Sequence, residues 1–178
     1  MALREKSIQS HDDLRVPFRN GSHYIVACMG NRISDTTIRM VYHIQPQDMN
    51  QYGSIHGGRL LTLADNTGFL AAHGHAGQRC LTVGVHQARF FRGAAVGLQI
   101  EIEAQVALTG RTSLWVPIRM RLAQEDQALV MDAVYVYVAV DENSHPQPIA
   151  DISADTPDEK ALQKHMLAIR DAFLGSRL

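Results

Sequence analysis

Several features that would assign this 178-residue sequence to a particular class of protein are missing from it. It has only two cysteines, Cys28 and Cys80, which lie far apart without the spacing of a zinc site or a disulfide framework. No run approaches the roughly 18 apolar residues that a membrane-spanning helix needs, and residues 1–13 lack the apolar core of a signal peptide. We therefore expect a cytoplasmic protein with reduced thiols, no metal site and no membrane partner.

An excess of positive charge is missing as well. The sequence has 17 lysines and arginines against 18 aspartates and glutamates, which argues against nucleic acid as the main partner. A hydrophobic content of 46% and a charged content of 20% are ordinary for a globular domain of this size. We predict a single domain over residues 23–150, preceded by a polar N-terminal arm at 1–22 and followed by a tail helix at 151–178.

What the sequence does contain is one long apolar helix pattern among strand patterns. Residues from about 57 to 75 are apolar on nearly every side, which is typical of a buried helix. A short apolar run at 24–28 fits an edge strand or a packed lead-in. Five longer strands are predicted as well. Alternating faces indicate strands near residues 36–44, 98–108 and 114–122, a content rich in valine and aromatics indicates one at 81–91, and a run that is apolar on both faces indicates a central strand at 128–140.

These elements predict an α+β fold in which a five-stranded antiparallel sheet wraps the long helix. Strands that are apolar on both faces also favour a homo-oligomer over a monomer. The tail begins with Thr156-Pro-Asp-Glu159, a capping box with proline at the first helical position, which predicts a second, amphipathic helix at the C-terminus.

The loop that runs into the long helix holds the candidate chemistry. Gly57 and Gly58 lie where a helix leaves its first N–H groups unpartnered, so their amides can bind a carbonyl oxygen or an oxyanion. Asp65 is a carboxylate in an apolar helix, which is costly unless the group is paired or used. Together with the polar side chain of Asn50, this predicts acyl chemistry. The alternative is that the glycines only permit a sharp turn and that Asp65 is a satisfied core residue.

A set of motifs in the same order resembles the hotdog-fold acyl-CoA thioesterases, in particular their acyl-CoA hydrolase branch, over about residues 36–150. The motifs are Asn50-x-x-Gly53-x-x-His56-Gly57-Gly58, Asp65, Thr82-x-x-Val85, Phe90, Gly110-Arg-Thr-Ser113 and Val138-Ala-Val-Asp141. The resemblance implies a hotdog fold, with a long central helix wrapped by the sheet, and homodimers that can assemble further into tetramers or hexamers. It also implies hydrolysis of fatty acyl-CoA to the free acid and CoA without a cofactor.

Carried over to this sequence, the resemblance assigns the catalytic carboxylate to Asp65 and the loop amide to Asn50, with each contributed by a different half of the dimer. It places the oxyanion site at Gly57 and Gly58. Two positions depart from the pattern of that branch: His86 stands where an aspartate is usual, and Leu98 where an acidic residue is usual.

Four further residues are candidates for binding the substrate. His56 precedes the glycine pair and can either contact the substrate or orient the loop. Arg89, and Arg111 with Ser113 in the Gly-Arg-Thr-Ser turn, can hold CoA phosphates, because arginine suits phosphate geometry. Each arginine can equally be an ordinary surface charge.

Two other functions remain open at this point. A hotdog dehydratase or hydratase usually pairs a histidine with its carboxylate, and no histidine accompanies Asp65 on its predicted helix face. A non-catalytic acyl-CoA-binding regulator would be favoured by a fused DNA-binding segment, and the N-terminal arm is too short and too mixed in charge to supply one.

Overall fold

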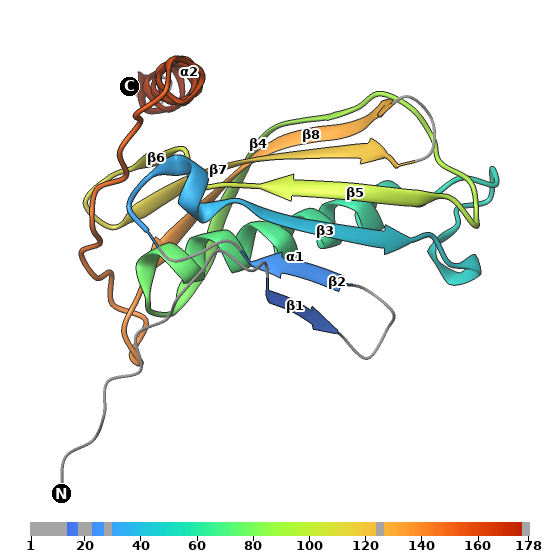
Figure 1. Ribbon diagram of the computed structural model, residues 1–178, viewed down its shortest axis with the longest axis horizontal. Helices are drawn as coiled ribbons and strands as arrows, with labels where there is room; N and C mark the ends of the chain where they lie inside the picture. The colour runs from blue at the N-terminus through green and yellow to red at the C-terminus, as the bar shows by residue number, and fades with distance from the viewer. Residues whose placement is uncertain (1–13, 18–22, 27–29, 124–126, 176–178) are drawn as a thin grey trace, which may run out of the picture.

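The computed structural model describes residues 14–17, 23–26, 30–123 and 127–175. Figure 1 shows a long helix lying along one antiparallel sheet. The elements are β1 (Leu14–Pro17), β2 (His23–Val26), η1 (Ile33–Thr36), β3 (Ile38–His43), η2 (Pro46–Asp48), α1 (Gly57–Ala76), β4 (Cys80–Phe90), β5 (Gln99–Ala104), β6 (Leu108–Thr109), β7 (Ser113–Leu122), β8 (Leu129–Ala139) and α2 (Pro157–Gly175).

The strand order across the sheet is β1-β2-β3-β5-β7-β8-β4, with β6 paired to β7, and every pairing is antiparallel. The predicted α+β class is confirmed, and the five long strands predicted correspond to β3, β4, β5, β7 and β8, to which the short strands β1, β2 and β6 are added. The run at 24–28 overlaps β2, which pairs with both β1 and β3, while residues 27 and 28 lie outside the described residues. Strand β1 lies in the segment expected to be a polar arm, since pairing with β2 satisfies its backbone groups whatever its side chains are.

The strand predicted at 98–108 is interrupted after Ala104. The amide of Val106 donates to Oγ1 of Thr36 at 2.9 Å instead of continuing a sheet ladder. Pairing resumes at β6, where Leu108 lies opposite Trp115. A hydroxyl from another element therefore ends β5, and alternation within the strand could not predict it.

Within a single chain, only one face of helix α1 is buried. The face toward the sheet holds Leu60, Leu63, Ala64, Thr67, Gly68, Ala71 and Ala72. The opposite stripe is open to solvent, and Phe69 on it is 38% exposed. The expectation of a helix buried on all sides is therefore wrong for the single chain, because this sheet covers one side of α1. No helix in the described part of the chain is both long and apolar enough to cross a bilayer.

Two tyrosines fix α1 against the sheet. The hydroxyl of Tyr135 donates to the carbonyl of Leu61 at 2.8 Å, and that of Tyr137 donates to the carbonyl of Asp65 at 2.9 Å. Two residues along a strand span about 6.6 Å, and the four residues from Leu61 to Asp65 rise about 6 Å along the helix, so the two tyrosines match the spacing of the two carbonyls. Gly68 is required for this approach, because a Cβ there would lie 2.5 Å from the Tyr137 hydroxyl.

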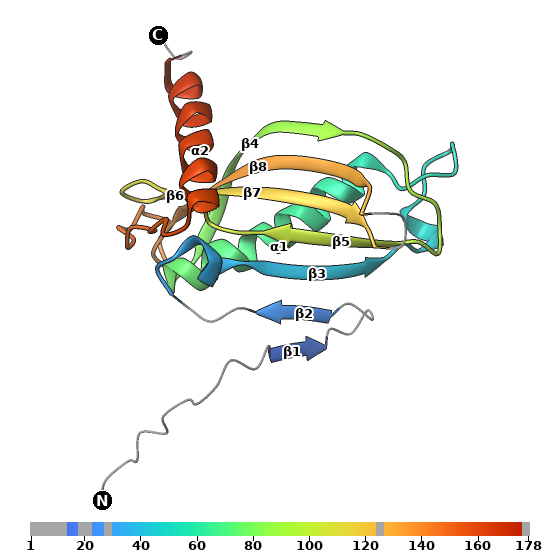
Figure 2. The same ribbon diagram turned by 45° about the horizontal axis from the view of Figure 1, so that its top comes forward.

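Helix α2 lies on the other face of the sheet from α1 (Figure 2). Its capping box forms as the sequence predicted: the Thr156 amide donates to Oε2 of Glu159 at 2.9 Å, and the Glu159 amide donates to Oγ1 of Thr156 at 3.2 Å. The amides of Asp155 and Ser34 donate to the same carboxylate, at 2.8 and 2.9 Å. Glu159 thus joins α2 to the segment before β3.

Replacing Glu159 by glutamine is expected to lower the free energy of unfolding by about 1–3 kcal/mol at pH 7, the usual worth of hydrogen bonds to a charged group. The backbone amides, that of Thr156 foremost, lower the pKa of Glu159 from 4.5 to about 2. Because the pKa is depressed in the folded state, this stabilisation is complete above about pH 4.5 and is lost as the pH falls toward 2. Urea unfolding of wild type and variant at pH 7 and at low pH measures it.

Glu142→Gln, at an exposed carboxylate, is the matched control. It should shift the unfolding midpoint much less than Glu159→Gln at neutral pH. If the free energies of unfolding of wild type and Glu159→Gln differed by the same amount at pH 7 and near pH 2, the stabilisation would not come from the charge of the Glu159 carboxylate.

Candidate active site

Asp65 lies half-buried on α1, and two donors from the sheet hold one of its carboxylate oxygens. The hydroxyl of Thr82 on β4 donates to Oδ1 at 2.7 Å, and the hydroxyl of Tyr137 on β8 lies 3.2 Å from the same atom. No donor among the described residues contacts Oδ2. The carboxylate is therefore fixed through one oxygen, with the other free to accept a proton or to bind a reacting atom.

The hydroxyl of Tyr137 stays protonated and can therefore donate a hydrogen bond. Burial raises the pKa of its hydroxyl strongly, and the negative charge of Asp65 raises it further. Burial also raises the pKa of Tyr135, to about 12. Both hydroxyls remain protonated at neutral pH, so Tyr137 can donate to Asp65 throughout a reaction at that pH.

Tyr137→Phe is expected to lower kcat roughly tenfold, about 1.4 kcal/mol, and to leave KM nearly unchanged, because the variant keeps the ring and loses the hydrogen bonds of one hydroxyl to the carbonyl and the carboxylate of Asp65. The main effect is expected on kcat, because Tyr137 acts by holding the Asp65 carboxylate in position. Tyr135→Phe is the matched control, since it loses a bond to the carbonyl of Leu61 and none to Asp65. Equal effects of the two variants on kcat would refute the role of Tyr137.

The side chain of Asn50 forms hydrogen bonds within its own loop. Its Oδ1 accepts the amides of Tyr52 and Ser54 at 2.9 and 3.2 Å, and its Nδ2 donates to Oγ of Ser54 at 3.1 Å. Asp65 lies eight residues beyond Gly57, about 12 Å along the helix axis. The chain by itself therefore does not bring Asn50 to Asp65.

A buried ionic network holds this loop on the start of α1. Asp48, 4% exposed, accepts the Tyr42 hydroxyl at 2.6 Å and Nε of Arg59 at 2.9 Å. Arg59 also donates to the Tyr42 hydroxyl at 3.0 Å, and the amide of His56 donates to the carbonyl of Asp48 at 2.8 Å. These contacts fix the loop that carries Asn50 relative to the helix N-terminus.

The first turn of α1 offers one free amide where two were expected. His56 is the N-cap residue, and its Nδ1 accepts the Gly58 amide at 2.9 Å, so within the single chain this amide already has a partner. The Gly57 amide has no hydrogen-bond partner among the described residues and lies at the positive end of the helix dipole. His56 thus orients the backbone, and Gly57 remains the available oxyanion donor.

The other candidate substrate-binding residues lie away from this cluster. Arg89 forms a two-pronged ion pair with Asp132 at 2.7 and 3.0 Å. Asp132, which lies opposite Arg89, and Val138, which lies opposite Ser113, are each an odd number of residues from Tyr137 along β8. The side chains of Arg89 and Ser113 therefore project from the sheet face that α1 does not cover. Arg111 lies in the exposed turn between β6 and β7. None of the three is brought next to Asp65 within the chain.

Sequence reasoning missed Thr82 and Tyr137 as site residues. Thr82 was part of the Thr-x-x-Val pattern, but no contact was assigned to it. A signal for Tyr137 was present in the alternation of Tyr135 and Tyr137 on one face of a strand that is otherwise apolar. Tyrosines in such a position need partners for their hydroxyls, and the long apolar helix packed on that face of the sheet can supply them.

Comparison with known proteins gives a consistent set of relatives. Residues 52–129 match the family model described as the thioesterase superfamily. The chain is 33% identical over 110 residues to the acyl-CoA thioester hydrolase YciA of Salmonella typhimurium, covering 58% of this chain and 83% of that protein.

Solved structures agree with the sequence relatives. The crystal structure of an apo-hexameric acyl-CoA thioesterase superposes with a TM-score of 0.76 at 28% identity, over 79% of this chain and 92% of that one. A hexameric thioesterase of Yersinia pestis superposes with a TM-score of 0.59 at 31% identity, over 62% of this chain and 92% of the other.

Proposed function

The chain belongs to the thioesterase superfamily, and on that premise we propose that it hydrolyses fatty acyl-CoA to the free fatty acid and CoA at a site shared between two protomers. The observation that carries this proposal is the Asp65 carboxylate, fixed by Thr82 and Tyr137 with its second oxygen free. The names of the acyl-CoA hydrolase relatives support the choice of substrate.

In this mechanism, Asp65 acts as general base or as nucleophile on the thioester carbon. As a base it accepts a proton from the attacking water, and the tetrahedral intermediate then expels the CoA thiolate, which takes up that proton. The Gly57 amide stabilises the oxyanion at the carbonyl oxygen. No step needs a metal or a cofactor.

The distance along α1 supports a shared site. Gly57 and Asp65 of one chain are separated by about 12 Å of helix rise, which is too far for both to act on a single carbonyl group. Asn50 belongs to the same end of the helix as Gly57. We therefore pair Gly57 and Asn50 of one protomer with Asp65 of its partner.

The open surfaces around Asp65 suit such a partner. Strand β4 ends the sheet, and its free edge is 11 residues long. Its apolar side chains are exposed, Val83 at 59% and Val85 at 44%, as is Phe69 at 38% on the open stripe of α1. Unpaired edges with exposed apolar side chains are normally covered, and a second copy of the chain would cover both β4 and α1. Larger assemblies of such dimers, tetramers or hexamers, are compatible with this arrangement.

A cytoplasmic location is part of the same proposal. The buried, free thiol of Cys80 is compatible with a reducing compartment. Burial raises the pKa of this thiol to about 11, so it is not a competing nucleophile at neutral pH.

Release of free CoA thiol from acyl-CoAs, from acetyl to palmitoyl, is the test of this function. We expect steady turnover of at least one chain length by the wild type, with the free fatty acid as the second product. Enoyl-CoA hydration without thiol release would favour the dehydratase or hydratase alternative. Tight acyl-CoA binding with neither reaction would favour a regulatory protein and would overturn the proposal.

A further inference from the structure

The face of the sheet opposite α1 carries a row of alternating charges across five strands. Arg39 on β3 lies opposite Glu103 on β5, Glu103 opposite Arg119 on β7, Arg119 opposite Asp132 on β8, and Asp132 opposite Arg89 on β4. Cross-strand neighbours of opposite charge attract one another, so this row is ordered by its own ion pairs.

The row contains one more positively charged side chain than negatively charged side chains. Glu103 pairs with Arg39 at 2.8 Å and Asp132 pairs with Arg89 at 2.7 Å, which leaves the guanidinium of Arg119, between the two pairs, without an ion pair among the described residues. Three guanidinium groups thus face two carboxylates. A ligand with a single negative charge would complete the row.

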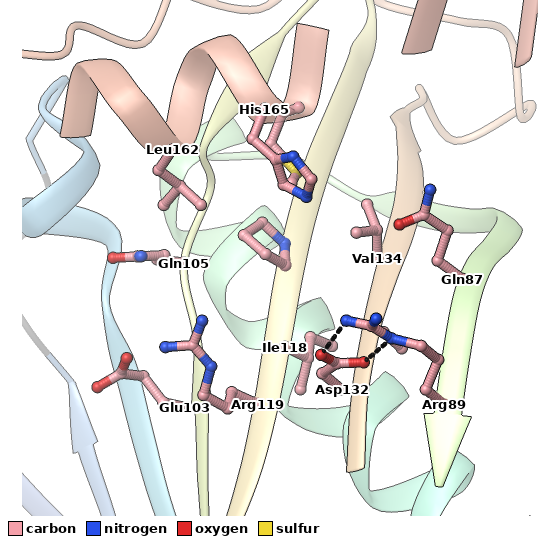
Figure 3. A pocket seen from close by; sticks show the side chains of 13 residues that line it. Gln87, Arg89, Glu103, Gln105, Ile118, Arg119, Asp132, Val134, Leu162 and His165 are labelled. Carbon is pink, nitrogen blue, oxygen red and sulfur yellow. Dashed lines mark hydrogen bonds and ion pairs between the residues drawn. The ribbon is translucent and has the colours of Figure 1, made fainter. Parts of the chain in front are cut away.

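A cavity of about 150 Å³ lies between this row and helix α2 (Figure 3). Its charged side is formed by two arginines and the two carboxylates of the row, Arg119, Arg89, Asp132 and Glu103. Leu162 and Met166 of α2 form part of the opposite wall. The remaining apolar surface comes from Pro117, Ile118, Ala133 and Val134.

Further donors surround the cavity. Figure 3 shows the imidazole of His165 directed from α2 toward the strands. Oε1 of Gln105 accepts the Thr37 hydroxyl at 3.1 Å, which leaves the amide nitrogen of Gln105 to donate, and Gln87 lines the opposite side. Together with Arg119, these groups favour an acceptor-rich ligand.

We propose that this cavity binds a short-chain aliphatic carboxylate, in a site distinct from the Asp65 cluster. One uncompensated guanidinium matches one carboxylate in charge, and its planar fork can hold both oxygens. The aliphatic chain lies against Leu162 and Met166. The volume has room for roughly five water-sized groups, which suits a molecule of the size of butyrate. Bound there, the ligand contacts both the strands and α2 and holds the helix on the sheet.

The test is a titration of the methionine-methyl-labelled protein with butyrate, followed by the NMR signals of the Met166 methyl group and the His165 ring. We expect saturable shifts with a Kd in the millimolar range. The wild type should show no saturable shift with n-butylammonium or n-butanol, which have the same chain without the negative charge. Tighter binding of inorganic phosphate than of butyrate would overturn the assignment to a carboxylate.

Arg119→Gln should weaken butyrate binding tenfold or more. Arg121→Gln is the matched control, because Arg121 lies on the same strand, donates to the carbonyl of Gln127 and does not line this cavity. Asp65→Ala should bind butyrate at this site as the wild type does, which separates it from product binding at the proposed active site. An Arg119→Gln variant that binds as tightly as the wild type, or shifts that do not saturate in the wild type, would refute the site.

Discussion

Asp65→Ala is expected to lower the turnover of acyl-CoA by about 10²- to 10⁴-fold with the fold intact, which is the usual worth of a general base. The carboxylate is held by Thr82 and Tyr137 through Oδ1, so its removal deletes the free oxygen Oδ2 from the site. The substitution also leaves the hydroxyls of Thr82 and Tyr137 without Oδ1 as an acceptor. Initial rates of thiol release at saturating and limiting acyl-CoA measure the effect on kcat and on kcat/KM.

Asp65→Asn separates chemistry from packing. The amide keeps the size of the side chain and one oxygen that can accept from Thr82, but it cannot take a proton at neutral pH. It should be nearly as inactive as Asp65→Ala. Asn66→Ala, at the next and exposed position of α1, is the matched control and should keep most of the activity. Hydrolysis by Asp65→Ala near the wild-type rate would remove Asp65 from the mechanism.

Co-assembly of Asn50→Ala chains with Asp65→Ala chains is expected to restore activity that neither variant has alone. In a mixed dimer with two-fold symmetry, one site combines the intact Asn50 of one chain with the intact Asp65 of the other, and the second site is doubly defective. Random pairing of equal amounts makes about half of the dimers mixed, so recovery should approach about a quarter of the wild-type activity.

Co-expression with two affinity tags isolates the mixed dimers and removes the dependence on subunit exchange. Asn50 also holds its own loop through Tyr52 and Ser54, so Ser54→Ala is the matched control: it loosens the loop and leaves the Asn50 amide in place. Verified mixed dimers with no more activity than their parents would show that the site is completed within one chain.

The amino-acid sequence was sufficient where the determining contacts are local. Hydrophobic periodicity predicted α1 and the long strands, because a helix or a strand repeats its buried face at a fixed spacing along the chain. The capping box of α2 formed as predicted, since Thr156 and Glu159 are three residues apart. Asp65 could be identified from the sequence because a carboxylate in an apolar helix is costly unless it is paired or used, wherever the helix packs.

The tertiary structure decided which residues meet Asp65 and which face each strand residue occupies. Thr82 and Tyr137 lie 17 and 72 residues from Asp65 and reach it only through the order of β8 and β4 in the sheet. A register shift between Thr82 and Gly84 places Val85 on the same face as Thr82, although the two are an odd number of residues apart. Strand alternation assumes an unbroken ladder, so it cannot predict such a shift.

The start of α1 shows the same division. Its position could be predicted from Gly57 and Gly58, but the rotamer of His56 determines that the Gly58 amide is capped, while the Gly57 amide has no partner in the described part of the chain. Side-chain rotamers depend on three-dimensional surroundings as well as on the backbone. The sequence by itself determined the elements and the acid at the centre of α1, because those follow from local periodicity. Only the folded chain decided the partners of that acid, because hydrogen bonds between distant residues depend on how the sheet and the helix pack together.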